Sequence, residues 1–427
     1  MKQYRPNFHI TPKTGWINDP NGFVYFKNKF FMYAQHNPYD CVWGPVHWLA
    51  FSSSDLIHWN EEGVVLKPDS SYDLEFGCFS GSSIVKEDKL YVLYTGVNNG
   101  KQTQCLAVSN DGLHFEKYKN NPVIDETLLP DGYLISDFRD PKVFYKFGYY
   151  YVIVSAKYKD NYSSILLFKS KDLFNWEFVN VLKNSEVGEM IECPSIIFDN
   201  DKCALIYSIQ FKKKENLSFQ NIHSVVYQVG SFDGTNFAPS GEVKEYDNGF
   251  DVYATYTLEY QQKNLLVYWL MMWDNEYPTK KEGYAGQLSS IREIKIVGDS
   301  LISSFVDEVK KLPNYKKITL DLDKKITTLN VYSNLDLVFN KENNEITISR
   351  NNMSDSIICS RGFDVLSRTF KYHLSNKVTL EFFFDNSAVE ILIDEGKASF
   401  SLLDFSYDSN LNSDIIITNG GNKNEAN

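Results

Sequence analysis

Ser53-Ser54-Asp55-Leu56-Ile57-His58-Trp59 is the first of four similar phrases in this chain, all of the pattern Ser-x-Asp-x-x-x-aromatic. The others are Ser109-Asn110-Asp111-Gly112-Leu113-His114-Phe115, Ser170-Lys171-Asp172-Leu173-Phe174-Asn175-Trp176 and Ser231-Phe232-Asp233-Gly234-Thr235-Asn236-Phe237. Their aspartates stand at positions 55, 111, 172 and 233, so the steps are 56, 61 and 61 residues. A nearly constant period of this size predicts an array of similar structural units.

Each phrase predicts a turn closed by its aspartate, followed by an aromatic side chain that packs back on the unit. Short runs rich in β-branched and aromatic residues lie between the phrases, for example 23–33, 89–95, 142–156 and 163–170. Four strands fit each interval, which is the content of a propeller blade. Residues from about 5 to about 300 would then form five blades. The fifth, residues 251–296, lacks the phrase, as closing units often do.

The pattern changes after residue 297. A charged run that ends at Pro313 predicts a linker, and alternating apolar and polar residues from Lys316 onward predict half-buried strands, clearest at 378–384 and 388–393. The sequence therefore predicts an all-β protein, a five-bladed β-propeller followed by a C-terminal β-sandwich. We expect a catalytic propeller at residues 1–298, a linker at 299–315, a sandwich at 316–427 and a disordered tail from Asn419.

Composition excludes several classes of protein. The 427 residues are 43% hydrophobic and 23% charged, as in soluble globular proteins, and a net charge of -12 argues against nucleic-acid binding. Residues 1–13 lack an apolar signal segment, and the apolar run 265–273 is too short to span a membrane, so we expect a cytoplasmic protein without a membrane partner. The six cysteines and seven histidines show no metal-ligand spacing, and we expect free thiols.

Trp16-Ile17-Asn18-Asp19-Pro20-Asn21-Gly22 is the most distinctive polar stretch. Pro20 biases Asp19 toward extended backbone, and Asn21-Gly22 favours a tight turn directly after it. This backbone geometry is therefore suited to hold Asp19 in place as a reactive carboxylate. The alternative is an ordinary hairpin in which Asp19 only accepts turn hydrogen bonds.

Other polar motifs fall at a similar phase of successive units. Asp19 lies 36 residues before Asp55, and Ser80 lies 31 residues before Asp111. Asp140 lies 32 residues before Asp172, and Glu192 lies 41 residues before Asp233. In a propeller this phase places Asn18-Asp19, Ser80-Gly81-Ser82, Arg139-Asp140 and Glu192-Cys193 around one axial funnel. Alone, Ser80-Gly81-Ser82 indicates a turn and Arg139-Asp140 a surface ion pair, while Glu192-Cys193-Pro194 is nearly uninformative. Three carboxylates that converge on one pocket instead indicate a catalytic constellation.

Hydrolysis of a glycosidic bond requires one carboxylate as nucleophile or base and one carboxylic acid as proton donor. Glu192 stands among Met190, Ile191, Cys193 and Pro194, and this apolar setting predicts the raised pKa of an acid. Asp140, beside Arg139, is expected to stay ionised and to accept hydrogen bonds from sugar hydroxyls. Aromatic walls for a sugar ring could come from Trp16, Trp43, Phe79 and Trp273.

With these residues the chain resembles glycoside hydrolase family 32, the invertase, fructanase and sucrose-6-phosphate hydrolase group. Besides the motifs above, the matching stretches are Tyr33-Ala34-Gln35-His36-Asn37-Pro38, Trp43-Gly44, His47-Trp48, Phe79-Ser80-Gly81-Ser82, Phe138-Arg139-Asp140-Pro141, Glu192-Cys193-Pro194, Phe250-Asp251-Val252-Tyr253-Ala254, Tyr277-Pro278-Thr279, Arg292-Glu293, Leu380-Glu381-Phe382-Phe383-Phe384-Asp385 and Val389-Glu390-Ile391. They cover nearly the whole chain and are jointly very specific.

The resemblance implies a retaining reaction without a metal or organic cofactor. It implies that Asp19 is the nucleophile, that Glu192 is the acid/base and that Asp140 stabilises the transition state. The residues expected to bind substrate are Trp16, Asn18, Gln35, Trp43, Phe79, Ser80, Arg139, Cys193, Tyr253 and Trp273. Departures from the family pattern occur at Ile191, at Thr255-Tyr256-Thr257 and at Ile291, and we expect them at the pocket rim.

The leading hypothesis is a β-fructofuranosidase that releases fructose from sucrose, sucrose 6-phosphate or short fructo-oligosaccharides. The segment from Asp73 to Ser82 is similar to the intracellular sucrose and sucrose-6-phosphate hydrolases. The alternatives are an exo-acting fructanase, an arabinan-directed glycosidase and a catalytically inactive sugar-binding propeller. The three intact carboxylates speak against the last. The C-terminal domain is expected to pack on the propeller and to offer an interface for a homo-oligomer.

Overall fold

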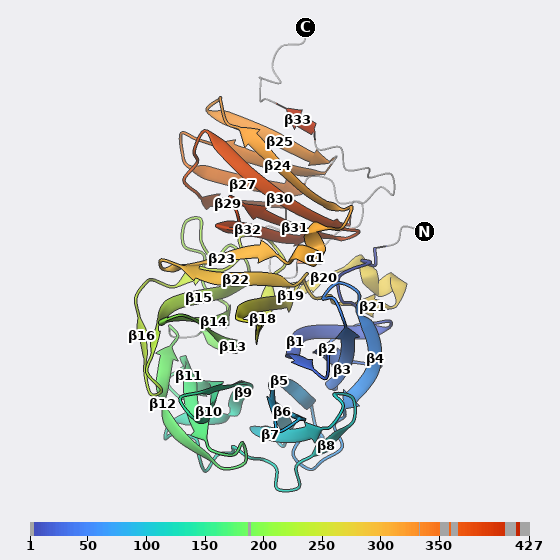
Figure 1. Cartoon of the computed structure of the whole chain (residues 1–427), viewed down its shortest axis with the longest axis vertical. Coiled ribbons are helices and arrows are strands. Elements are labelled where there is room, and N and C mark those ends of the chain that lie inside the picture. The colour runs from blue at the N-terminus through green and yellow to red at the C-terminus, as the bar shows by residue number, and fades with distance from the viewer. Residues whose placement is uncertain are drawn as a thin grey trace.

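A computed structural model describes residues 4–186, 189–332, 334–350, 358–359, 366–405 and 416–418. Five sheets surround a central channel, and a second body of two facing sheets stands at one side of this ring (Figure 1). The predicted fold class, a five-bladed β-propeller followed by a β-sandwich, is confirmed. No helix among the described residues is long and apolar enough to cross a membrane. The tail predicted from Asn419 lies outside the described residues.

The first four blades are each built from consecutive strands, with the first strand facing the channel (Figure 1). The first contains β1 (Gly15–Phe26), β2 (Lys29–Asn37), β3 (His47–Ser53) and β4 (Asn60–Leu66), with β21 (Tyr284–Ala285) beside β1. The second contains β5 (Gly77–Lys86), β6 (Lys89–Asn98), β7 (Lys101–Ser109) and β8 (Phe115–Lys117). The third contains β9 (Tyr133–Lys146), β10 (Tyr149–Tyr158), β11 (Ser163–Ser170) and β12 (Trp176–Asn184). The fourth contains β13 (Met190–Asp199), β14 (Lys202–Gln210), β15 (His223–Phe232), β16 (Phe237–Pro239) and β17 (Lys244–Glu245).

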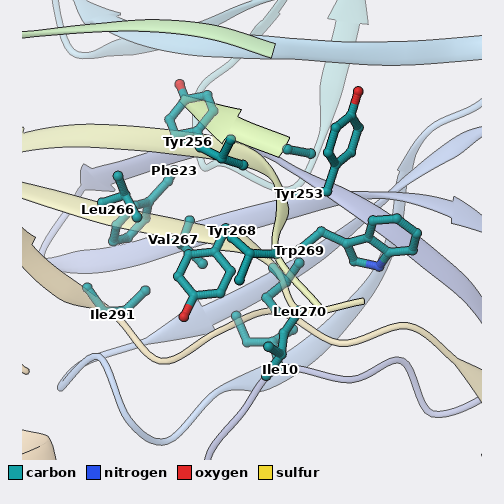
Figure 2. Close-up of a cluster of buried hydrophobic side chains, with 14 of the residues drawn as sticks. Ile10, Phe23, Tyr253, Tyr256, Leu266, Val267, Tyr268, Trp269, Leu270 and Ile291 are labelled. Carbon is teal, nitrogen blue, oxygen red and sulfur yellow. The ribbon is translucent and has the colours of Figure 1, made fainter. Parts of the chain in front are cut away.

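The fifth blade contains β18 (Tyr253–Tyr260), β19 (Lys263–Trp269), β22 (Arg292–Val297) and β23 (Ser300–Phe305). A short strand, β20 (Asn275–Glu276), and the 3-10 helix η1 (Pro278–Glu282) interrupt it between β19 and β22. Figure 2 shows apolar side chains of β18 and β19 packed against Phe23 and Ile10 from the start of the chain. This packing joins the last blade to the first.

The repeated phrase forms a turn closed by its aspartate, as predicted, and the structure places this turn between the third and fourth strands of a blade. Asp55 Oδ1 accepts the backbone amides of Ile57 (3.0 Å) and His58 (2.8 Å). Asp111, Asp172 and Asp233 accept the equivalent two amides of their own turns. A carboxylate thus replaces backbone partners at the same corner of four blades.

Every inner strand has a register irregularity at its polar motif. In the first four blades, two residues of the inner strand stand opposite one residue of the second strand, at Asn18-Asp19, Phe79-Ser80, Asp140-Pro141 and Cys193-Pro194. In the fifth blade, Ala254 is the extra residue. Such a β-bulge bends the strand and re-aims its side chains, so the bulges account for the convergence of these motifs on the channel.

The sandwich consists of two antiparallel sheets that enclose their own apolar core. One sheet contains β24 (Tyr315–Asp321), β30 (Lys377–Asp385), β31 (Ala388–Ile393) and β32 (Ala398–Leu403). The other contains β25 (Ile326–Tyr332), β26 (Leu335–Asn340), β27 (Glu345–Arg350), β29 (Ser367–Lys371) and β33 (Ile416–Thr418). A further strand, β28 (Ile358–Cys359), pairs with β20 of the propeller. Apolar residues alternate with polar ones along β25, β26 and β27, as expected for sheets with one buried face.

The predicted domain boundaries, 298 and 315, stay a prediction, and the strand pairing indicates how to adjust them. β23, within the predicted linker, pairs with β22 along its whole length and so belongs to the fifth blade. The one-turn helix α1 (Asp307–Lys310) follows, and β24 begins the sandwich. We therefore propose that the junction is residues 306–314.

A buried ionic network joins the sandwich to the propeller. Glu390 on β31 accepts a hydrogen bond from Arg292 Nη2 of β22 (2.7 Å) and contacts His9 Nε2 (2.9 Å). The other ring nitrogen of His9 lies 2.8 Å from Asp385 Oδ2. None of these four side chains has exposed surface. Because each buried charge has a hydrogen-bonded partner, these contacts offset the desolvation cost of the ions at the interface.

This network is sensitive to pH in both directions. Burial by itself would lower the pKa of His9, but hydrogen bonds to Asp385 and Glu390 raise it to about 9. Burial would raise the pKa of Glu390, but the charge of Arg292, with the contacts of His9, lowers it to about 2. Glu390 therefore stabilises fully above its ordinary pKa of 4.5 and loses this effect toward pH 2. His9 stabilises fully below 6.5 and loses its effect as the pH rises through about 9.

Glu390→Gln should destabilise the protein by about 3–5 kcal/mol at pH 6, because it leaves the charges of Arg292 and His9 buried without their shared anion. Denaturant unfolding measures this loss. The control is Glu342→Gln, which removes an exposed partner of Lys325 on the sandwich surface and should barely change stability. Equal effects of the two changes would contradict a role of the network in holding the domains together.

Candidate active site

A pocket of about 420 Å³ opens at one end of the propeller channel. It is lined by Asn18, Asp19, Gln35, Trp43, Phe79, Gln102, Asp137, Arg139, Asp140, Glu192, Gln210, Phe211, His223, Tyr253, Trp273 and Asp274. All five blades contribute to this lining. The pocket is strongly acidic, with five carboxylates and one arginine among these residues.

Asp19 forms hydrogen bonds through both of its oxygens. Oδ1 accepts from Asn18 Nδ2 (3.0 Å), while Oδ2 accepts from Ser80 Oγ (2.6 Å) and Gln35 Nε2 (3.1 Å). The Cys193 thiol also points at Oδ2, at 3.4 Å. These contacts fix the carboxylate orientation from the first, second and fourth blades. Burial, and next the charge of Glu192, raise the pKa of Asp19 above its ordinary range although Ser80 and Asn18 oppose this shift.

Asp140 is the middle member of the three carboxylates. Its backbone has a left-handed φ of 64°, and its Oδ2 accepts the amide of Cys193 at 2.9 Å. Burial raises the pKa of Asp140 to about 7, and the charges of Glu192 and Asp19 add to this effect while Arg139 opposes it. The pKa of Asp140 is therefore shifted toward the neutral form, contrary to the expectation from its neighbour Arg139. In the sequence Arg139 stands next to Asp140, but its guanidinium is directed at Glu192.

Glu192 is held by donors on both oxygens. Arg139 donates to Oε1 through Nε (3.1 Å) and Nη2 (2.9 Å). Gln210 Nε2 (2.8 Å) and the Tyr253 hydroxyl donate to Oε2. Burial by itself would raise the pKa of Glu192, but the charge of Arg139 and the hydrogen bonds from Tyr253 and Arg139 outweigh it and lower the pKa.

The raised pKa expected for Glu192 is therefore wrong. The hydrogen-bond partners of its carboxylate are Arg139, Gln210 and Tyr253, none of which is a neighbour in the sequence. Ile191 alternates to the opposite side of β13 and packs in the core between the third and fourth blades. Side chains from other strands, which a local reading does not see, decide the electrostatics of Glu192.

Aromatic side chains form the wall and rim of the pocket. Trp43 is 39% exposed and lies edge-on to Phe79, with ring centroids 5.9 Å apart. Trp273 stacks on Trp16 at 5.7 Å. Trp16 itself does not line the pocket, and its indole nitrogen donates to Asn18 Oδ1 at 2.9 Å. Trp43, Phe79 and Trp273 can thus contact a sugar ring directly, whereas Trp16 supports Trp273 and orients Asn18.

The structure brings the three predicted carboxylates together and places seven predicted substrate residues in the lining: Asn18, Gln35, Trp43, Phe79, Arg139, Tyr253 and Trp273. The other three lie behind it. Trp16 supports the wall, while Ser80 and Cys193 line a smaller cavity deeper in the channel. Ser80 contacts Asp19 and Gln35 of the pocket lining, and Cys193 contacts Asp19 and Asp140. These three residues therefore position lining residues rather than face the pocket.

One group of donor atoms in the described chain is close enough to hold a metal ion. Asp19, Asp140 and Cys193 offer ligand atoms within 4.8 Å of one another. Burial, followed by the charge of Asp19, raises the pKa of the Cys193 thiol well above its ordinary value. The protonated thiol thus serves as one of the donors that orient Asp19.

Comparison with known sequences now identifies the group to which this geometry belongs. The profile "Glycosyl hydrolases family 32 N-terminal domain" matches residues 9–304, and "Glycosyl hydrolases family 32 C terminal" matches residues 308–425. The chain belongs to glycosyl hydrolase family 32. The two family profiles thus cover both the propeller with its pocket and the sandwich.

Several relatives resemble most of the chain. A sucrose-6-phosphate hydrolase of Bacillus subtilis is 30% identical over 451 residues, which cover 95% of this chain and 90% of the relative. One of Escherichia coli is 36% identical over 322 residues, covering 72% of this chain and 66% of the relative. The chain thus spans about two thirds of the length of this second relative.

Among solved structures, a family 32 β-fructofuranosidase of Bombyx mori superimposes with a TM-score of 0.83 at 32% identity, over 94% of this chain and 89% of that one. A variant of the same enzyme, solved in complex with sucrose, matches with a TM-score of 0.83 at 31% identity and the same coverage. The likeness extends over both domains.

The sequence predicts that the departures from the family 32 pattern lie at the pocket rim, but the structure places them elsewhere. Ile191 is buried in the core between blades. Thr255 and Tyr256 face the deeper part of the channel, and Ile291 precedes Arg292 of the domain interface. The positions therefore cannot set the leaving-group preference by direct contact in the pocket.

Six lining residues escaped the sequence analysis: Gln102, Asp137, Gln210, Phe211, His223 and Asp274. Gln102, Gln210 and His223 stand near the ends of β7, β14 and β15, away from the inner strands. Gln102 Oε1 accepts the amide of Phe138 (2.9 Å), and Asp137 Oδ1 lies 3.2 Å from Arg139 Nη1. No repeated spacing marks these positions, and only Asp137, two residues before Arg139, had a local signal.

Tyr253→Phe should move the alkaline limb of kcat/KM to higher pH if Glu192 is the acid. The Tyr253 hydroxyl favours ionised Glu192, so its loss raises the pKa of Glu192 and keeps the carboxyl protonated to higher pH. A pH profile on sucrose measures the limb. The control is Tyr256→Phe on the same strand, whose hydroxyl accepts the Ser83 amide and should leave the limb in place. An unmoved or lowered limb in Tyr253→Phe would remove Glu192 from this role.

Proposed function

We propose that this chain is a retaining β-fructofuranosidase that hydrolyses the fructosyl bond of sucrose, sucrose 6-phosphate or short fructo-oligosaccharides. The observation that carries the proposal is the grouping of Asp19, Asp140 and Glu192 in one aromatic-walled pocket of a family 32 propeller. Relatives named sucrose-6-phosphate hydrolase, and one named β-fructofuranosidase, support it.

In the first half of the reaction, Asp19 attacks the anomeric carbon of fructose and displaces the other sugar, while Glu192 gives its proton to the departing oxygen. Asp19 is suited to this attack because four neighbours fix the direction of its carboxylate. As the new bond forms, Asp19 loses its negative charge. The pKa of nearby Glu192 then falls, which favours release of its proton at this moment.

In the second half, ionised Glu192 takes a proton from water, which attacks the same carbon and releases Asp19. Arg139, Gln210 and Tyr253 stabilise the carboxylate that acts as this base. Asp140, expected to bind fructose hydroxyls, adds negative charge beside a sugar that becomes positively charged in the transition state. An oxocarbenium-like centre is thus stabilised by the acidic lining of the pocket.

The finer properties of the enzyme are part of the same proposal. The leaving group is glucose or its 6-phosphate, as the names of the bacterial relatives suggest. Five cysteines of the described residues are free thiols, which supports the expected cytoplasmic location. The sandwich remains the part of the chain where we expect a homo-oligomer to form.

Asp19→Asn should reduce kcat on sucrose to less than about a hundredth of the wild-type value, because the amide cannot form the covalent intermediate. The fold should survive, since burial already disfavours the charge of Asp19. Thermal unfolding verifies the fold, and released glucose measures kcat. Asp137→Asn is the control, as it changes another lining carboxylate, which contacts Arg139 and Ser136 but not Asp19. Asp19→Asn activity above a hundredth would refute the nucleophile role.

The substrate preference can be tested by kcat/KM on sucrose, sucrose 6-phosphate, kestose and inulin. We expect sucrose 6-phosphate and sucrose to exceed inulin by at least about tenfold, because a pocket of about 420 Å³ encloses only a few sugar rings. Equal values on inulin and sucrose would instead indicate an exo-acting fructanase. If none of the four substrates releases reducing sugar, the result would favour the catalytically inactive sugar-binding protein.

A further inference from the structure

A second pocket opens at the opposite end of the propeller channel. We call it the rear pocket; its volume is about 370 Å³, close to that of the active-site pocket. A small cavity of about 20 Å³ lies between the two. Asp140 lines both the active-site pocket and the small cavity, while Lys142, two residues further along β9, lines both the small cavity and the rear pocket. The three spaces therefore follow one another along the channel.

Lys142 is the unusual feature of the rear pocket. Its side chain is 8% exposed, its ammonium donates to the carbonyl of Thr257, and it lies 3.6 Å from the centroid of the Tyr256 ring. Within the described part of the chain, no carboxylate pairs with it. By contrast, the buried Arg139, Arg292 and Arg350 each lie within 2.9 Å of a carboxylate oxygen. A buried cation without an anion is costly, so an anionic ligand would be favoured here.

The walls of the rear pocket are suited to a sugar ring. The rings of Tyr25 and Tyr260 lie 4.7 Å apart on one part of its lining, and those of Phe144 and Phe198 lie 5.6 Å apart on another. Figure 2 shows that Tyr253 and Tyr256 project to the same side of the chain, opposite to Tyr268. Residues three positions apart normally point to opposite faces of a strand. The extra residue at Ala254 shifts this alternation, so Tyr253 lines the active-site pocket and Tyr256 of the same strand lines the rear pocket.

We propose that the rear pocket binds a small sugar phosphate, whose phosphate meets Lys142 and whose ring packs against the aromatic walls. Lys142 supplies the charge that selects the phosphate, and the aromatic pairs supply apolar area for a sugar face. Ser83, Glu259 and Asn264 in the lining provide polar partners for hydroxyls. The site is separate from the fructosidase pocket, and its ligand need not be a substrate.

Burial alone lowers the pKa of Lys142 to about 7. The bound phosphate would raise this pKa again, since an opposite charge favours the ammonium. Ligand binding should therefore take up a proton near neutral pH, an effect that calorimetry in buffers of different ionisation enthalpy detects.

The test measures binding of glucose 6-phosphate by calorimetry to the Asp19→Asn protein saturated with sucrose, so that the active-site pocket is filled. We expect one molecule per chain, with glucose and inorganic phosphate each binding at least about tenfold more weakly. Adding Lys142→Met should weaken glucose 6-phosphate about tenfold, through loss of a charge-assisted hydrogen bond. The matched control is Lys146→Met, which also removes a lysine from an aromatic ring (Phe198, 3.9 Å) but does not line the pocket.

The proposal is overturned if glucose 6-phosphate does not bind, if glucose or phosphate binds equally well, or if Lys142→Met and Lys146→Met behave alike. Should Lys142→Met not fold, Tyr260→Ala at the pocket wall replaces it, and unchanged binding of glucose 6-phosphate then refutes the site. Should sucrose not bind Asp19→Asn, the proposed function is in doubt, and the lysine variants are compared without sucrose.

Discussion

Four hydrogen bonds from one blade to the next hold the active-site strands in place. In the inner strands of the second to fifth blades, a backbone amide at the bulge is free of the sheet, and a side chain of the preceding blade accepts it. These bonds are Gly81 to Asn21 Oδ1 (3.2 Å), Asp140 to Thr95 Oγ1 (3.0 Å), Cys193 to Asp140 Oδ2 (2.9 Å) and Ala254 to Ser208 Oγ (3.0 Å). Asp140, Cys193 and Ala254 adopt left-handed φ values of 48–64°, which costs about 1–3 kcal/mol each for a non-glycine residue. The surrounding hydrogen bonds keep these residues in that conformation and so keep the carboxylates converged.

Much of the fold could be predicted because the repeat has a local physical cause. An aspartate that accepts two amides of its own turn needs a fixed short pattern, and that pattern returns once in each of four blades. The C-terminal end of the fifth blade could not be predicted from the repeated phrase. β23 follows a turn at Gly298 without the phrase, and its charged continuation resembles a linker. Only its pairing with β22 shows that it is the outer strand.

The site was predictable in its carboxylates and less so in their electrostatics. Asp19, Asp140 and Glu192 share a phase in the repeat, so their convergence follows from the fold. The pKa of Glu192 instead depends first on Arg139 and then on Tyr253, which come from two other blades. The adjacent Ile191 points to the other face of the strand and so says little about the charges that Glu192 meets. Tertiary contacts thus reversed the two local expectations, for Glu192 and for Asp140.

The protein has two buried charge clusters, in which the same kinds of side chain have their pKa values shifted in opposite directions. At the domain interface, Glu390 and Asp385 face Arg292 and His9, so every group is shifted toward its charged form. In the pocket, three carboxylates share one arginine, and burial shifts Asp19 and Asp140 toward their neutral forms. The first arrangement stabilises the contact between domains. The second arrangement is unfavourable by itself but becomes favourable when a sugar carries positive charge, which is the condition that a glycosidase transition state supplies.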